Sequence, residues 1–192
     1  MKQQLTENDE FTLHGSNTKI TIMDFCLWAF SDSICNTSQE IMAKFLVYSA
    51  LNQINPDSPK RVNRLPYDIT SPSGRRIKIK SAAYIHAFSP ENIFAQIKFD
   101  IDGKLAWNDE TATYVSNPCH NCDLYVFCLF TAYTNEIPMF NLDYWDFYIL
   151  SASALNEKKI KHKKISLSSL LSLKPIKTNY TGLKTVTESI KL

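Results

Sequence analysis

The sequence predicts a mixed α/β domain in which a central sheet is flanked by helices. Three patterns support this class: a helical spacing of apolar residues over 38 to 52, a hairpin signal over 67 to 83, and an apolar run of strand length at 123 to 133. With 192 residues, of which 44% are hydrophobic, the chain is long enough to bury one substantial core. We therefore expect a single domain over residues 1–192.

Two helices are expected in the N-terminal third of the chain. After a short alternating segment that begins at residue 19, Asp24 is placed to cap an aromatic-rich helix that runs to Phe30. The stretch 38 to 52 carries apolar residues three and four positions apart, and Thr37 or Ser38 precedes it as a candidate N-cap. The longer of these patterns predicts a helix that lies against the sheet.

The stretch 67 to 83 predicts a β-hairpin. A short strand at 67 to 70 is followed by the turn Ser-Pro-Ser-Gly and by a second strand from Arg75 to about Ala83. If the loop is 72 to 74, with Gly74 in the left-handed conformation, Asp68 lies opposite Lys78.

Residues that face one another across a hairpin share a face of the sheet, and so do residues two apart on one strand. Asp68, Lys78 and Lys80 are therefore expected to form a cluster. A simpler interpretation is that Lys78 extends into solvent from an edge strand.

The remaining elements follow in the C-terminal half. The run 123 to 133 is apolar almost throughout, which is typical of a strand buried on both faces at the centre of a sheet. Aromatic residues such as Trp107, Trp145 and those from 144 to 148 could stack on bases, but alternation along a strand favours the core. Further strands are expected at 91 to 101 and 145 to 150, and a short helix at 165 to 173 with Leu167, Leu170 and Leu171 packed on the sheet.

The charge distribution is uneven although the net charge is only +2. The stretch 60 to 80 holds seven basic residues and one acid, and 156 to 164 is rich in lysine. Such patches suit phosphate-rich partners, DNA above all and RNA as well, or they form ordinary solvated surfaces. The N-terminus lacks an apolar signal segment, and no stretch reaches the roughly 18 apolar residues of a membrane span, so a cytoplasmic protein is expected.

The run from Asp68 to Lys78-Ile79-Lys80 resembles the PD-(D/E)XK nuclease superfamily, which has the restriction-endonuclease-like fold. The segments DFCLWAFSDS, YDITSPSGRRIKIKSAAY, DLYVFCLF and YWDFYILSASAL resemble, in the same order, those of an uncharacterised bacterial family of that superfamily. The resemblance implies a nuclease-like core over 19–170, an N-terminal extension over 1–18 and a C-terminal segment over 171–192.

In that superfamily two carboxylates hold Mg²⁺ and a lysine positions the attacking water, which the preference of Mg²⁺ for oxygen ligands explains. The resemblance places Asp68 on the first acid, Lys80 on the lysine and Ser81 on the serine that follows it. Two positions depart from the pattern, because Lys78 falls on the strand glutamate and Lys44 on the glutamate of the first helix.

Three hypotheses follow. In the first, Lys44 and Lys78 replace Mg²⁺ beside Asp68, helped by Glu40, and the protein binds nucleic acid or a partner without cleaving it; no cofactor is then needed. In the second, Asp68 and Glu40 bind Mg²⁺ and Lys80 orients water in an active DNA endonuclease. In the third, the chain is a protein-interaction subunit of a defence or mobile-element system and its basic patches are merely solvated.

Two further groups of residues are candidate sites. Arg75 and Arg76, at the start of the second hairpin strand, are candidates for phosphate contacts, together with Ser81. Cys119 and Cys122 form a single CxxC pair, and since structural zinc usually needs four ligands, a loop is the favoured interpretation.

Overall fold

The computed structural model describes ten segments of the chain. These are residues 5–32, 35–52, 65–86, 96–102, 107–108, 111, 113–114, 122–134, 136–157 and 163–192.

The elements of the N-terminal half are β1 (Glu10–Leu13), β2 (Ser16–Thr21), α1 (Ile22–Ala29), α2 (Asn36–Asn52), β3 (Ile69–Thr70), β4 (Arg76–Ala83), the 3₁₀ turn η1 (Tyr84–His86) and β5 (Lys98–Asp100). Those that follow are β6 (Trp107–Asn108), β7 (Thr113–Tyr114), β8 (Leu124–Phe130), η3 (Leu142–Tyr144), β9 (Trp145–Ser151), α4 (Ala152–Glu157), β10 (Lys164–Ser166), α5 (Leu167–Ser172), β11 (Ile176–Thr178) and α6 (Leu183–Ser189).

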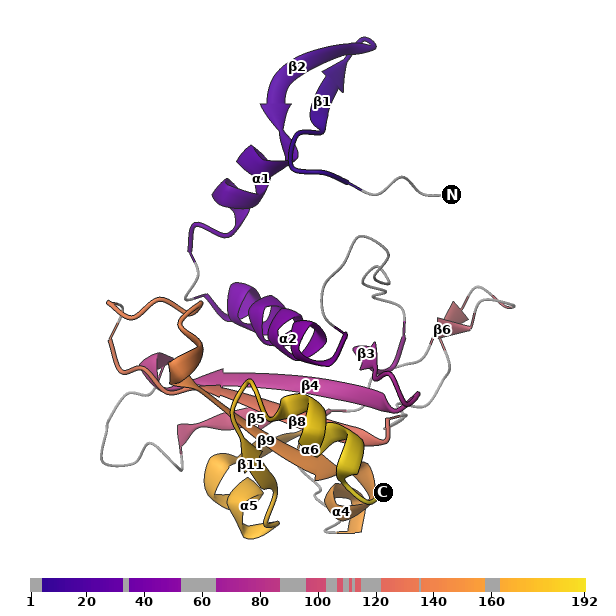
Figure 1. Ribbon diagram of the computed structural model, residues 1–192, viewed down its shortest axis with the longest axis vertical. Coiled ribbons are helices and arrows are strands. Elements are labelled where there is room, and N and C mark those ends of the chain that lie inside the picture. The colour runs from indigo at the N-terminus through magenta and orange to yellow at the C-terminus, as the bar shows by residue number, and fades with distance from the viewer. Residues whose placement is uncertain are drawn as a thin grey trace.

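A five-stranded mixed sheet forms the centre of the protein (Figure 1). Its strand order is β11-β9-β8-β4-β3, in which β4 and β8 are parallel and the other neighbours antiparallel. The predicted α/β class with a mixed, helix-flanked sheet is therefore confirmed. The predicted central strand is also confirmed, because β8 has a neighbour on each side and all of its residues are buried.

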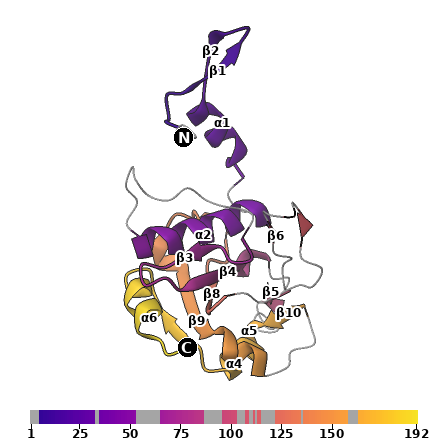
Figure 2. The ribbon, with the colours of Figure 1, turned by 90° about the vertical axis from the view of Figure 1, so that its right-hand side faces the viewer.

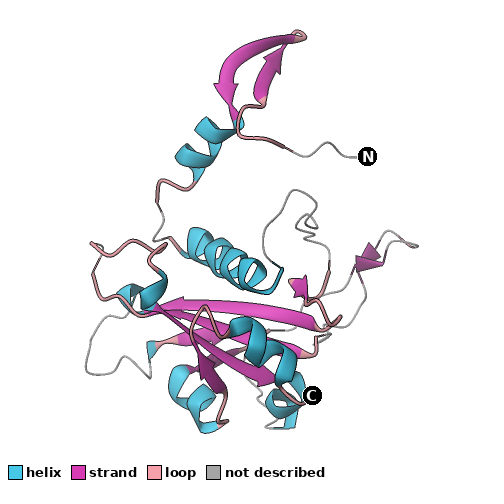
Figure 3. Cartoon of the chain, viewed as in Figure 1, coloured by secondary structure: helices cyan, strands magenta, loops and turns pink. Residues whose placement is uncertain are grey.

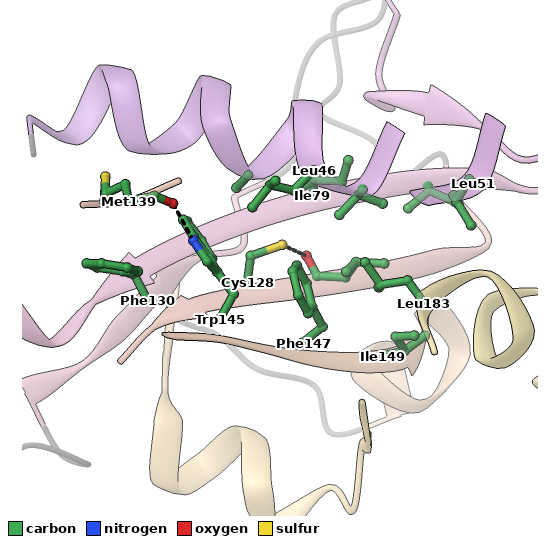
Figure 4. Close-up of a cluster of buried hydrophobic side chains, with 14 of the residues drawn as sticks. Leu46, Leu51, Ile79, Cys128, Phe130, Met139, Trp145, Phe147, Ile149 and Leu183 are labelled. Carbon is green, nitrogen blue, oxygen red and sulfur yellow. Dashed lines mark hydrogen bonds between the residues drawn. The ribbon is translucent and has the colours of Figure 1, made fainter. Parts of the chain in front are cut away.

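Helices lie on both sides of the central sheet (Figure 3). The alternation of side chains along β8 divides the interior into two cores. Leu124, Val126 and Cys128 face α2 and α6, whereas Tyr125 and Phe127 face the layer that contains β5, β10, α4 and α5. Figure 4 shows the first core, where Leu46 and Leu51 of α2 lie above Ile79 and the side chains of β9. Trp145 belongs to this core and donates its indole N–H to the Met139 carbonyl at 2.7 Å.

The hairpin around β3 and β4 has the predicted turn. The Ser71 N–H donates to the Arg75 carbonyl and the Gly74 N–H to the Ser71 carbonyl, both at 2.9 Å, and Gly74 has a φ of +84°. Ile69 pairs with Ile77, so Asp68 comes opposite Lys78 as expected. The first strand is shorter than predicted, since only Ile69–Thr70 pair in the sheet.

Several boundaries differ from the prediction. Helix α2 begins at Asn36, and α1 begins at Ile22 with Thr21 as its N-cap. Asp24 lies in the first turn of α1 and completes a capping box with Thr21, so the prediction that Asp24 is the cap was wrong.

Two C-terminal expectations need similar correction. In α5, Leu167 and Leu170 are buried, but Leu171 faces solvent rather than the sheet. The strand expected at 91 to 101 is described only as β5, which pairs with β10 in a separate two-stranded sheet, and residues 91–95 lie outside the described part.

The N-terminal elements β1, β2 and α1 stand away from the rest of the protein in both views (Figures 1 and 2). The resemblance placed residues from 19 onwards within the core, yet α1 has no buried residue. Within the described residues, no helix is long and apolar enough to cross a membrane.

Gly74 is the position in the hairpin where a side chain should be costly. A non-glycine residue at a positive φ is destabilised by roughly 1–2 kcal/mol, although the space around a Cβ at Gly74 is open. We expect Gly74→Ala to lower the free energy of unfolding by about this amount in urea denaturation, and Gly74→Asn to lower it less, since asparagine tolerates this conformation. Equal losses for the two variants would contradict this explanation.

Candidate functional site

The carboxylate of Asp68 lies at the edge of β4, and Asp68 is the residue directly before β3 begins. The backbone of Asp68 still follows the hairpin, since its N–H donates to the Ile77 carbonyl at 2.9 Å. Its side chain binds the next free donor of β4, since Oδ2 accepts the Ile79 N–H at 2.8 Å. Asp68 therefore satisfies a backbone donor that would otherwise be exposed at the sheet edge.

Lys44 reaches Asp68 from the helix side of the sheet. On either side of Lys44 in α2, the side chains of Ala43 and Leu46 belong to the core between α2 and β4. This packing fixes the position of the helix over the strand. The Lys44 Nζ lies 3.2 Å from Asp68 Oδ1 and 2.5 Å from Glu40 Oε1, one helical turn earlier. The Lys44 ammonium is thus held between two carboxylates.

This position determines the protonation of Lys44. Burial acts to lower the pKa of Lys44, but the hydrogen bond to Glu40 and the charges of Asp68 and Glu40 outweigh it and raise the pKa above its ordinary value. Lys44 therefore carries its positive charge at physiological pH.

Lys78 approaches the same carboxylate from the opposite face of the sheet. It pairs in register with Tyr125, which belongs to the second core, and only 4% of Lys78 is exposed. Its Nζ donates to the Pro66 carbonyl at 3.0 Å and lies 3.8 Å from Asp68 Oδ2. The simpler interpretation, in which Lys78 extends into solvent, was wrong.

The site therefore consists of one buried carboxylate with an ammonium group on each side. The Asp68 side chain is 10% exposed, and those of Lys44 and Lys78 are 15% and 6% exposed, whereas Glu40 is 52% exposed. The structure brings together the four residues that the first hypothesis grouped. With two lysines and two acids the cluster is balanced, and Glu40 is the member that solvent reaches.

These residues do not fit a Mg²⁺ ion. Magnesium needs oxygen ligands in near-octahedral geometry, usually from one or two carboxylates and several waters. Both oxygens of Asp68 face ammonium or N–H donors, and Lys44 separates Asp68 from Glu40. Across the described segments, no group of three or more His, Cys, Asp or Glu residues is placed to hold a metal ion.

Lys80 and Ser81 continue along β4 on opposite faces. Lys80 is half-buried and shares the face of Lys78, beside Phe127 of β8. Ser81 is half-buried and lies on the α2 side, as Ile79 does. The roles that the resemblance implies for Lys80 and Ser81 stay predictions.

Arg75 and Arg76 both bind groups of the same chain. The Arg75 Nη1 donates to the Thr187 carbonyl at 2.8 Å and to the Ile190 carbonyl at 2.7 Å, at the end of α6. Arg76 binds Asp123 through Nη2 at 2.7 Å, through Nε at 3.2 Å and through its backbone N–H at 2.8 Å. These contacts tie the hairpin to the C-terminal helix and to the start of β8. That the two arginines contact phosphate stays a prediction.

The candidate zinc pair is described only in part. Cys122 is buried, and burial raises its pKa to about 11, whereas Cys119 lies outside the described residues. A thiol with a raised pKa stays protonated at neutral pH. The loop interpretation of this pair stays a prediction.

Sequence reasoning missed three partners of the candidate residues. The Pro66 carbonyl and the Ile79 N–H in the Asp68 cluster are backbone groups, and no residue type marks them in advance. Asp123, the partner of Arg76, was the third, and its position directly before the buried run 124 to 130 was the signal that could have identified it.

A comparison with models of known protein families and a comparison with curated proteins both gave no match. The function proposed below therefore depends on the geometry of the site.

Substitutions at Asp68 and Lys78 should have non-additive effects on the free energy of unfolding. Asp68→Ala leaves the buried Lys78 ammonium without this carboxylate, whereas Lys44 keeps Glu40. Breaking a buried pair costs about 3–5 kcal/mol. We expect the double variant Asp68→Ala/Lys78→Met to be more stable than Asp68→Ala alone, as measured by urea denaturation.

The exposed pair of Lys163 and Asp102, at 3.1 Å, supplies the control. Asp102→Ala should cost at most about 1 kcal/mol. Additive losses for Asp68→Ala and Lys78→Met would mean that the two side chains do not interact.

The Arg76–Asp123 contact should appear in acid titration. Hydrogen bonding from Arg76, together with its charge, lowers the pKa of Asp123 below the ordinary 3.8, although partial burial opposes this. Because the folded-state pKa is depressed, the stabilisation is complete above pH 3.8 and is lost as the pH falls through the folded-state value. The difference in unfolding free energy between the protein and Asp123→Asn should be constant near neutral pH and shrink in that acid range, and a difference that is the same at all pH values would contradict it.

Proposed function

We propose that this chain is a non-hydrolytic, nucleic-acid-binding module of restriction-endonuclease-like type in which lysines have taken the place of a metal ion. The observation that supports the proposal is the convergence of Lys44 and Lys78 on the Asp68 carboxylate, one from each face of the sheet. A divalent cation in a nuclease would neutralise this acid. Here two ammonium groups supply the positive charge beside it.

Charge supports a phosphate-bearing ligand. The cluster holds as many ammonium groups as carboxylates, and Lys80, two residues beyond Lys78 on the same face, adds a further positive charge beside it. A phosphate backbone is attracted to such a site, and each phosphate that is neutralised releases counterions. DNA is the favoured ligand, and RNA is the alternative because it has the same kind of phosphate backbone.

The endonuclease alternative keeps Asp68 and Glu40 as metal ligands and Lys80 as the residue that orients water. It requires Lys44 to leave its position between the two carboxylates, which would break both of its ion pairs. The raised pKa of Lys44 disfavours the neutral amine that would tolerate a nearby Mg²⁺. The non-hydrolytic proposal requires neither change.

A protein-interaction role has one observation in its favour, the exposed apolar surface of α1. It does not exclude nucleic-acid binding at the Asp68 site, because α1 stands apart from the sheet in both views (Figures 1 and 2).

Fluorescence anisotropy with labelled duplex and single-stranded DNA tests the proposal. We expect binding that weakens steeply as salt rises, with Lys80→Ala weakening it several-fold and reducing the salt slope by about one unit per lost phosphate contact. Lys163→Ala, an exposed lysine paired with Asp102, is the matched control and should change the affinity little.

The same samples should be incubated with Mg²⁺ and Mn²⁺. We expect no hydrolysis by the protein, and we expect calorimetric Mg²⁺ binding to appear only in Lys44→Glu/Lys78→Glu, which restores oxygen ligands beside Asp68. Cleavage that is abolished by both Asp68→Ala and Lys80→Ala would instead support the endonuclease alternative. Absence of salt-sensitive binding to DNA or RNA would leave the protein-interaction role.

A further inference from the structure

Two tyrosines lie in contact at one end of the central sheet. Strands β4 and β8 are parallel neighbours as far as the pair of Ala83 and Phe130, so the segments that follow them leave the sheet at the same end (Figure 1). Tyr84 comes directly after β4, and Tyr133 comes three residues after β8. Their ring centroids are 5.0 Å apart, with an angle of 44° between the ring planes. The parallel register of the two strands therefore brings these rings together.

Tyr133 is exposed although the chain beside it is anchored. Two residues earlier, Thr131 donates to the Tyr144 carbonyl through its backbone N–H at 2.8 Å and through Oγ1 at 3.1 Å. Ala132, next to Tyr133, is only 1% exposed, whereas Tyr133 itself is 59% exposed. A ring that is presented on an anchored backbone loses little conformational freedom when a ligand stacks on it.

Tyr84 supports Tyr133 from the interior of the protein. It is half-buried and packs against the second core. Burial, together with the neighbouring Tyr133 and Asp146, raises the pKa of Tyr84, so its hydroxyl group stays protonated. Asp146 is in turn paired with Lys177 at 2.8 Å, so the negative charge beside the two tyrosines is balanced. The pair is therefore a neutral aromatic surface with a buried base.

The two tyrosines follow Lys80 along the same side of the sheet. Tyr84 comes four residues after Lys80, and both are on the side that carries the second core. Four residues of extended strand span roughly 13 Å. A cation and an exposed aromatic ring in this order suit a polyanion that carries bases, since phosphate is attracted to the lysine and a base stacks on the ring. The bases of a duplex are already stacked on one another, so a single strand fits this arrangement better.

We propose that Tyr133, supported by Tyr84, stacks on an unpaired base of single-stranded DNA whose phosphate backbone passes Lys80. This inference rests on the nucleic-acid binding proposed above and adds to it the form of the ligand. Every base has an aromatic face, so stacking on Tyr133 tolerates any sequence. The site therefore selects single strands over duplexes rather than one sequence over another.

Fluorescence anisotropy with labelled oligothymidine, and with an abasic oligonucleotide of the same length, tests the stacking. The abasic strand keeps the phosphates and lacks the bases. We expect Tyr133→Ala to weaken binding to oligothymidine about five-fold or more and to leave binding to the abasic strand unchanged. Tyr133→Phe keeps the ring and should bind as the unaltered protein does. Phe45→Ala removes an exposed ring from α2, on the other side of the sheet, and as the matched control should change neither affinity.

The salt dependence separates this inference from the proposal on which it rests. Tyr133→Ala removes no phosphate contact and should keep the salt slope, whereas Lys80→Ala should reduce the slope by about one unit. Salt-sensitive binding that is equally strong in Tyr133→Ala, or that is tighter for duplex than for single-stranded DNA, would overturn the stacking inference alone. Absence of salt-sensitive binding in the unaltered protein would overturn both. Circular dichroism melts confirm that each variant is folded.

Discussion

The candidate site depends on the interactions of one group, the carboxylate of Asp68 at the edge of β4. It accepts the backbone N–H of Ile79 in place of a neighbouring strand and faces Lys44 and Lys78 with its two oxygens. Each of these lysines is largely removed from water, and burial of an unpaired ammonium group would be very costly. Removal of the carboxylate would take an ion-pair partner from each lysine, so the hairpin, α2 and the sheet are joined electrostatically through one side chain.

Packing makes that arrangement possible. Strand β8 is buried along its whole length and gives alternate side chains to the two cores, which holds β4 beside it and α2 above it. Two arginines strengthen the same region from outside, since Arg75 binds the end of α6 and Arg76 binds Asp123 at the start of β8. The hairpin that carries Asp68 is thereby anchored where β4 begins.

The N-terminal elements β1, β2 and α1 are held together by different contacts from those of the central sheet. Their hairpin and capping box are local, with partners a few residues apart in the chain, whereas the sheet is built from contacts between distant segments. Local hydrogen bonds can form an element without a core, but they leave its apolar side chains exposed.

The sequence by itself determined the class of fold, the central buried strand, the long helix and the hairpin with its left-handed glycine. Each of these follows from short-range rules: the period of apolar residues, the turn geometry at Gly74, and a continuous apolar run. The same rules placed Asp68 opposite Lys78, because a hairpin register is fixed by its turn.

Tertiary structure decided the rest. That Lys44 meets Asp68 depends on how α2 lies across β4, and that Lys78 is buried depends on the second core beneath it. The two adjacent arginines form a patch of positive charge in the sequence. In the folded chain Arg75 donates to two carbonyls at the end of α6, and Arg76 donates to the carboxylate of Asp123. A sequence lists which groups are charged. Only the packed chain decides which charges meet, because a side chain selects its partner by distance and by how completely water is removed from both.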